Sequence, residues 1–145
     1  MNRSITILDT NVVSEPMRPS PSSAVLAWLS ENQGTGLLFV TTITMAETLL
    51  GIELLPRGKR RDQMLAQAEA VFAEDFTERV LPFDEDAARA FPEIVARRRA
   101  QGRPIADLDA QIAAIAHSRG AILATRNTAD FEGCGIRLVN PWTEP

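Results

Sequence analysis

Five short, continuous apolar runs alternate with segments of helical spacing, and this alternation limits what a chain of 145 residues can fold into. Short apolar runs rich in Ile, Val and Leu are typical of buried strands. Strands that alternate with helices form a mostly parallel sheet with helices on both faces. The sequence therefore predicts an α/β fold, a three-layer α/β/α sandwich in a single domain, residues 1–145. Its sheet has about five strands, near 4–9, 37–40, 80–83, 121–125 and 136–139.

The segments between these runs carry apolar residues at helical spacing and end at Pro or Gly. Ser22 or Ser23 is expected to cap the first helix, and Asp84 the fourth. Pro82 confines its strand to an edge of the sheet, because proline cannot donate a hydrogen bond to a neighbouring strand. The expected helices cover about 24–29, 44–55, 60–79, 85–101 and 107–118.

Composition excludes several classes of protein. The net charge of −4 argues against nucleic-acid binding by bulk attraction. No apolar run approaches the ~18 residues of a membrane span. Cys134 is the only cysteine, which excludes a disulfide framework and a cysteine-based zinc site and fits a reducing cytoplasm. Two arginine-rich segments, 57–61 and 97–103, are either solvated helix faces or contacts for phosphate, which arginine binds in a bidentate manner.

Acidic residues recur where strands end and helices begin. Asp9 follows the first strand, and Glu47 lies in the first turn of the helix after the second strand. Ligands of parallel sheets gather outside the carboxyl ends of the strands, so both acids are candidates for a site. Each also has a plainer interpretation. Asp9 would cap the following helix, and Glu47 would be favoured near a helix N-terminus by the helix dipole.

The helix at 107–118 offers two further acids. Asp109 shares a stripe with Ala113 and Ala116, whose small side chains allow close approach to the sheet, so we expect Asp109 to face inward. Asp107 shares its face with Ala110 and Ala114, which we expect to be the wetter side. Asp107 is therefore interpreted as the N-cap of this helix.

The strand at 121–125 repeats the pattern of the first one, because it ends in Thr125 and is followed by Asn127 and Asp130. Taken singly, Asn127 would be a turn residue and Asp130 a cap. Together with Asp9 and the other acids, they fall at one edge of the predicted sheet. Several carboxylates in one cleft raise one another's pKa, and a hard divalent cation removes the repulsion. The sequence thus predicts a Mg²⁺ or Mn²⁺ site that activates water on a phosphodiester.

These motifs, in this order, resemble those of PIN-domain toxins of the VapC/FitB type, from bacterial and archaeal toxin–antitoxin pairs. The sequences Val-Ser-Glu-Pro and Asn-Pro-Trp resemble the FitB branch in particular. The matching segments are 8–16, 43–52, 109–114, 124–131 and 140–142.

The resemblance implies a single PIN domain with the activity of a metal-dependent endoribonuclease, which hydrolyses RNA with metal-activated water. Asp9, Glu47 and Asp109 would be the core metal-binding acids. Asp130 is the choice for the fourth, whereas FitB-like sequences place an acid where this chain has Asn127. Asn127 would then orient water or phosphate. Three small polar residues would hold the acids in place, namely Thr10, Asn11 and Thr125. The candidate contacts for RNA phosphates are Arg126, Arg97, Arg98, Arg60 and Arg61.

The resemblance also implies partners. We expect a homodimer, a cognate antitoxin whose helix docks in an apolar groove near 44–72, and operator DNA bound only through that antitoxin. We expect no membrane partner. The alternative from another functional class is a PIN-fold subunit that mainly binds an antitoxin, within a complex that binds operator DNA, and has weak or no nuclease activity.

Two phosphoryl-transfer folds that also place an acid after a strand do not match. A haloacid-dehalogenase phosphatase needs a second Asp two residues after the first, where this chain has Asn11. A receiver domain needs a lysine after a late strand, and the only lysine is Lys59.

Overall fold

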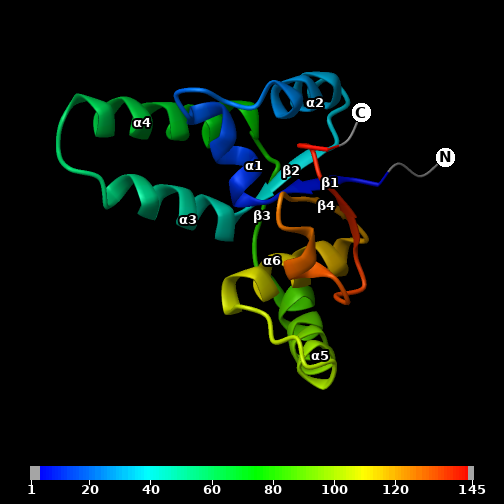
Figure 1. Ribbon diagram of the computed structural model, residues 1–145. Helices are drawn as coiled ribbons and strands as arrows, with labels where there is room; N and C mark the ends of the chain where they lie inside the picture. Colours follow the sequence, from blue (N-terminus) through cyan, green and yellow to red (C-terminus); the bar gives the residue numbers. More distant parts are fainter. Residues whose placement is uncertain (1–3, 144–145) are drawn as a thin grey trace.

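The computed structural model describes residues 4–143 and has a five-stranded sheet in the order β3-β2-β1-β4-β5. Each pairing between neighbouring strands is parallel, as Figure 1 shows for β1, β2 and β4. The predicted α/β fold with a parallel sheet is therefore confirmed. The strands are β1 (Thr6–Leu8), β2 (Leu38–Thr41), β3 (Val80–Leu81), β4 (Ile122–Ala124) and β5 (Arg137–Val139).

Helices cover both faces of this sheet, as expected for three layers (Figure 1). One face carries α1 (Thr10–Ser14), the 3-10 turn η1 (Glu15–Met17), α2 (Ser23–Gln33), α3 (Thr42–Glu53), α4 (Lys59–Ala70) and the π-helical turn η2 (Val71–Asp75). The other face carries α5 (Glu85–Ala100) and α6 (Asp107–Arg119), and the 3-10 turn η3 (Thr128–Phe131) joins β4 to β5. No helix within residues 4–143 is both long and apolar enough to cross a membrane.

Consecutive residues of β1 supply the two halves of the core. Ile7 is fully buried against α5 and α6, while Leu8 is buried against the helices of the opposite face. This alternation follows from the pleat of a strand, whose successive side chains point to opposite faces. The strand thereby brings its next residue, Asp9, to the carboxyl edge of the sheet between both layers.

The local signals for helix starts hold in most places. The Ser22 hydroxyl accepts a hydrogen bond from Val25 N, and Asp84 accepts one from Ala87 N, so both predicted caps are confirmed. β3 ends before Pro82 and lies at the edge of the sheet, also as predicted. The helix expected at 60–79 forms but is shorter than predicted, because α4 ends at Ala70 and continues only as the π-helical turn η2 to Asp75.

Helix α6 differs from the expectation in two ways. Asp107 is its first helical residue and makes no side-chain cap, because Ala106 occupies the N-cap position. Ala110 and Ala114 are not on a wet face but fully buried, and α6 packs extensively against α5. Leu108, an apolar residue of the same helix, is 46% exposed, whereas Ile112 and Ile115 are fully buried. The sequence pattern could not show that α6 lies between the sheet and another helix.

Candidate metal centre

Asp9 lies at the point where the order of the strands reverses. From β1 the chain continues to β2 and β3 on one side, and β4 and β5 then pair on the other side of β1. The backbone N–H of Asp9 donates to Ala124 O (2.9 Å), and the Thr125 hydroxyl donates to Asp9 Oδ2 (2.7 Å). Its other oxygen, Oδ1, accepts from Thr10 N (2.8 Å), so Asp9 also caps α1. Only 6% of Asp9 is exposed. A switch point between parallel strands is where such folds bind their ligands.

Glu47 is held toward Asp9 by the residue that follows Asp9. The Thr10 hydroxyl donates to Glu47 Oε1 (2.7 Å) and shares a second hydrogen bond with the buried Thr44 hydroxyl (3.1 Å). Helix α3 begins at Thr42 with Thr41 as its cap, so Glu47 lies beyond the first turn. The helix dipole falls off within that turn, which removes the plainer interpretation of Glu47.

Asp109 is half-buried near the start of α6, whereas Asp107 is exposed. The pKa of Asp109 is raised to about 6, mainly by burial and then by the negative charges of Asp9, Asp130 and Glu47. A group feels such repulsion only from charges that lie close to it. The expectation that Asp109 faces the other acids, and Asp107 does not, agrees with this arrangement.

Asp130 and Asn127 are both exposed, at opposite ends of η3. The charge of Asp130 raises the pKa of both Asp9 and Asp109, so this carboxylate is electrostatically part of the cluster. Asn127 instead donates its backbone N–H to the Thr125 hydroxyl (3.1 Å). Asn127 thereby orients the threonine that in turn holds Asp9.

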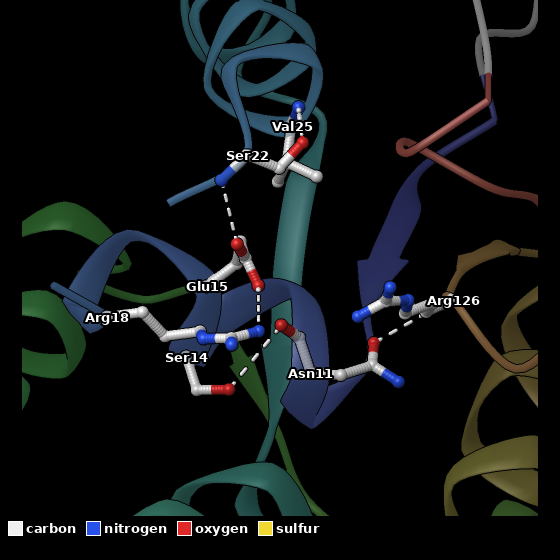
Figure 2. Close-up of polar contacts among 7 residues, drawn as sticks. All are labelled: Asn11, Ser14, Glu15, Arg18, Ser22, Val25 and Arg126. Atoms are coloured by element: carbon white, nitrogen blue, oxygen red, sulfur yellow. Dashed lines mark hydrogen bonds and ion pairs between the residues drawn. The ribbon is translucent and has the colours of Figure 1, made fainter. Parts of the chain in front are cut away.

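Asn11 connects α1 to the loop after β4. Its Oδ1 accepts a hydrogen bond from the backbone N–H of Arg126 (3.4 Å), as Figure 2 shows. The side chain of Arg126 is exposed, and its guanidinium lies over the ring of Trp142 at 5.1 Å from the centroid. Arg126 is therefore accessible at the rim of the acidic cluster.

The acids of this cluster fit a hard divalent cation. Burial raises the pKa of Asp9, and the negative charges of Glu47 and Asp130 raise it further. Hydrogen bonds from the Thr125 hydroxyl and the Thr10 backbone act in the opposite direction and lower it. A cation would relieve this repulsion, and all donors are oxygens, which suits Mg²⁺ or Mn²⁺. In residues 4–143 no three acidic, imidazole or thiol side chains lie close enough together to enclose a metal. Mg²⁺ does not need such a cage, because it keeps several waters and binds one or two carboxylates directly.

One predicted RNA contact is wrong. Arg98 is only 4% exposed, and it donates through Nε to Arg103 O (2.6 Å) and through a terminal nitrogen to Glu132 O (2.6 Å). Its guanidinium ties the end of α5 to the loop between η3 and β5. A phosphate outside the protein cannot reach a guanidinium that is buried and satisfied in this way.

The other predicted arginines differ in accessibility. Arg97 and Arg60 are exposed, whereas Arg61 forms an ion pair with Glu53 (2.7 Å). The run of charges at 57–61 is thus partly engaged within the protein.

Sequence reasoning missed a buried acid next to this region. Glu15 is 4% exposed, and its carboxylate accepts from Ser22 N (2.8 Å) and from Arg18 (3.3 Å), as Figure 2 shows. Glu15 therefore joins the end of α1 to the start of α2. The signal for it in the sequence is the Val-Ser-Glu-Pro segment, in which Glu15 directly precedes Pro16 at the end of α1.

Comparisons with known proteins agree with this architecture. The PIN domain family matches residues 6–133. The plasmid stability protein StbB of Pseudomonas syringae pv. tomato is 43% identical over 94% of this chain and 97% of its own. VapC ribonuclease Y4jK of Sinorhizobium fredii is 40% identical (94% and 96%), and toxin FitB of Neisseria gonorrhoeae is 38% identical (94% and 97%).

Solved structures show the same fold. FitAB bound to an IR36 DNA fragment superposes with a TM-score of 0.88 at 36% identity, over 97% of this chain and 98% of the other. FitAcB from Neisseria gonorrhoeae gives a TM-score of 0.87 at 36% identity, over 97% and 100%.

Proposed function

The chain belongs to the PIN-domain family and is similar to VapC ribonucleases and toxin FitB, and on that premise we propose that it is the toxin of a type II toxin–antitoxin pair. Its activity would be that of a Mg²⁺- or Mn²⁺-dependent endoribonuclease. The observation that supports this proposal best is electrostatic. Asp9, Glu47, Asp109 and Asp130 come from four separate segments, and the pKa of Asp109 is raised to about 6 partly by the other three.

The side chains around these acids would hold them ready for a cation. Thr125 and the Thr10 backbone fix both oxygens of Asp9, and the Thr10 hydroxyl fixes Glu47. A bound Mg²⁺ would supply a polarised water and a partner for phosphate oxygens. Asp9, Asp109, Glu47 and Asp130 would hold it directly or through water.

Other residues would position the RNA. Arg126 is exposed in the loop that Asn11 anchors, and its guanidinium would bind a phosphate in a bidentate manner. Arg97 and Arg60 are exposed cations further away along the chain. An exposed single strand suits a site recessed between helices, because its backbone is not held in a duplex.

The expected partners are a cognate antitoxin, operator DNA bound through that antitoxin, and a second copy of this chain, in the cytoplasm. The similar FitAB structure contains an IR36 DNA fragment, which supports an assembly of this kind. Leu50 on α3 and Leu54, directly after its end, are 57% and 75% exposed, within the segment at 44–72 where docking of the antitoxin helix is expected. Exposed apolar residues on one helix suit docking of an amphipathic partner.

The test uses full-length protein purified free of antitoxin, incubated with total RNA and either Mg²⁺ or Mn²⁺. We expect cleavage that EDTA prevents, and that Asp9→Asn and Asp109→Asn abolish. Equal cleavage by wild type and both variants would overturn the proposal, and so would no cleavage with either metal. The second outcome would favour the alternative of a subunit that mainly binds an antitoxin.

A further inference from the structure

Arg126 is a cation beside the acidic cluster, yet it forms no ion pair with an acid in the part of the chain that the structure describes. It directly follows Thr125, whose hydroxyl holds Asp9, and its side chain is exposed. Arg126 is also not among the groups that chiefly lower the pKa of Asp9 or Asp109. A contact other than an ion pair therefore determines where this guanidinium lies.

That contact is with the ring of Trp142. The guanidinium carbon of Arg126 lies over this ring at 5.1 Å from its centroid, within the ~6 Å range of a cation–π contact. The ring is half-buried and packs against the core cluster that contains Leu8 and Val12. A cation–π contact is comparable in energy with an exposed ion pair, so the ring can hold the guanidinium against the attraction of nearby acids.

Hydrogen bonds on both sides fix the backbone of the loop that carries Arg126. Its N–H donates to Asn11 Oδ1 (3.4 Å; Figure 2), and its carbonyl accepts from the side-chain amide of Asn140 (3.4 Å). The Oδ1 of Asn140 accepts in turn from Trp142 N (2.9 Å). Asn140 thus ties together the backbones of the two residues whose side chains are in contact.

The N–H groups of the Arg126 guanidinium remain available. They donate no hydrogen bond within residues 4–143, where only the backbone of Arg126 takes part in hydrogen bonds. An arginine presents these donors in a planar fork whose geometry matches the oxygens of a phosphate. In an RNA strand at the acidic cluster, the backbone phosphates are the groups that fit this fork.

We propose that Trp142 is a positioning residue, which holds the Arg126 guanidinium at the rim of the acidic cluster so that it binds an RNA phosphate and not a metal-binding carboxylate. The inference rests on the proposed ribonuclease function and adds Trp142 to it, acting through Arg126. Without the ring, Arg126 would pair with an acid of the cluster, such as the exposed Asp130. That pairing would compete with the cation.

This competition can be measured without RNA. Full-length protein free of antitoxin is titrated calorimetrically with Mn²⁺ as wild type, Trp142→Leu, Arg126→Gln and the double variant. We expect Trp142→Leu to weaken Mn²⁺ binding roughly two- to fivefold, the factor that corresponds to an exposed cation–π contact. The double variant should bind Mn²⁺ at least as tightly as wild type, because no guanidinium is left to compete. Damage to the fold by Trp142→Leu would not be repaired by a second substitution at Arg126.

Binding of RNA tests the phosphate contact. A fluorescein-labelled single-stranded RNA of mixed sequence is titrated by anisotropy at low salt in EDTA, which prevents metal-dependent cleavage. Arg126→Gln and Trp142→Leu should each weaken binding roughly two- to fivefold, and the double variant should bind no more weakly than Arg126→Gln. Trp142→Phe keeps an aromatic ring and should bind like wild type. Trp28→Leu is the matched control, since Trp28 packs against the same core cluster, and should leave RNA affinity unchanged.

Four results would overturn this inference. They are wild-type protein that does not bind the RNA, Trp142→Leu protein that binds Mn²⁺ and RNA like wild type, a double variant that binds Mn²⁺ as weakly as Trp142→Leu, and losses of RNA affinity that add in the double variant. Wild-type protein that binds no Mn²⁺ would contradict the metal centre, and the RNA titrations would then decide on Trp142. Conversely, protein that cleaves no RNA but shows the expected coupling of Trp142 with Arg126 would contradict the proposed nuclease and not the role of Trp142.

Discussion

The hydroxyl of Thr125 donates a 2.7 Å hydrogen bond to Asp9 Oδ2, although the two residues are 116 positions apart in the sequence. They follow the paired residues Leu8 and Ala124 of β1 and β4, so the parallel register itself brings them together. Thr125 is fully buried and is the one side chain whose hydrogen bond most lowers the pKa of Asp9. The strand pairing thereby supplies a hydrogen bond that favours the charged form of Asp9, against the burial that raises its pKa.

Thr125→Val should weaken binding of Mn²⁺ about 10–100-fold, because the carboxylate loses the hydrogen bond that orients it and favours its charged form. Isothermal titration calorimetry of the wild type and the variant would measure this change. Thr125→Ser keeps the hydroxyl and serves as the control. Equal affinities for all three proteins would show that the hydroxyl does not support the site.

The metal-free protein should lose stability as the pH rises from about 4 to above 6. The pKa of Asp109 is about 6 in the folded protein against an ordinary value of 3.8, so the folded state binds more protons in this range. Ionisation is then less favourable in the folded state than in the unfolded state. Asp109→Asn should flatten the slope, measured as the urea midpoint in EDTA at several pH values. An equal slope in the variant would assign the pH dependence to other groups.

Arg98→Met should lower the free energy of unfolding by roughly 2–4 kcal/mol, because it removes charge-assisted hydrogen bonds to two backbone carbonyls. Urea denaturation would measure the loss. Arg99→Met, at an exposed position of the same helix, is the matched control and should change stability by less than about 0.5 kcal/mol. A stable Arg98→Met protein with weakened RNA binding would restore the original prediction of a phosphate contact.

Asp107→Asn should leave cleavage of RNA within about twofold of wild type, whereas Asp109→Asn should abolish it. Asp107 is exposed and is not among the groups that chiefly raise the pKa of Asp9 or Asp109, while Asp109 is half-buried and feels the charges of the other acids. Initial rates on one labelled RNA at saturating Mg²⁺ would compare the two substitutions. Comparable loss in both would contradict the orientation of α6 described here.

The sequence predicted the sheet, its parallel strands and the edge at which the acids meet, because hydrophobic spacing and strand ends are local signals. It also separated Asp109 from Asp107 by the small residues that share the stripe of Asp109. This argument succeeded for Asp109 although the wetness assigned to Ala110 and Ala114 was wrong. Small residues on one stripe of a helix indicate that another element packs closely against it. Helix α6 has such a neighbour on two sides, the sheet and α5.

Other features depend on contacts between distant segments and left no local pattern. In the sequence, Arg98 cannot be told from its neighbours in a run of arginines. Only the fold shows that it is buried and donates hydrogen bonds to backbone carbonyls, including Glu132 O from a distant segment. The buried hydroxyl of Thr48, which has no hydrogen-bond partner within residues 4–143, also looks in the sequence like any polar residue of a helix.

The central claim is that Asp9 and the acids around it form a site for a divalent cation. Calorimetric titration of the antitoxin-free protein with Mn²⁺ tests it most directly. We predict saturable binding to wild type and to Asp107→Asn, and loss of that binding in Asp9→Asn. Absence of binding to the wild type, or equal binding to Asp9→Asn, would contradict the claim.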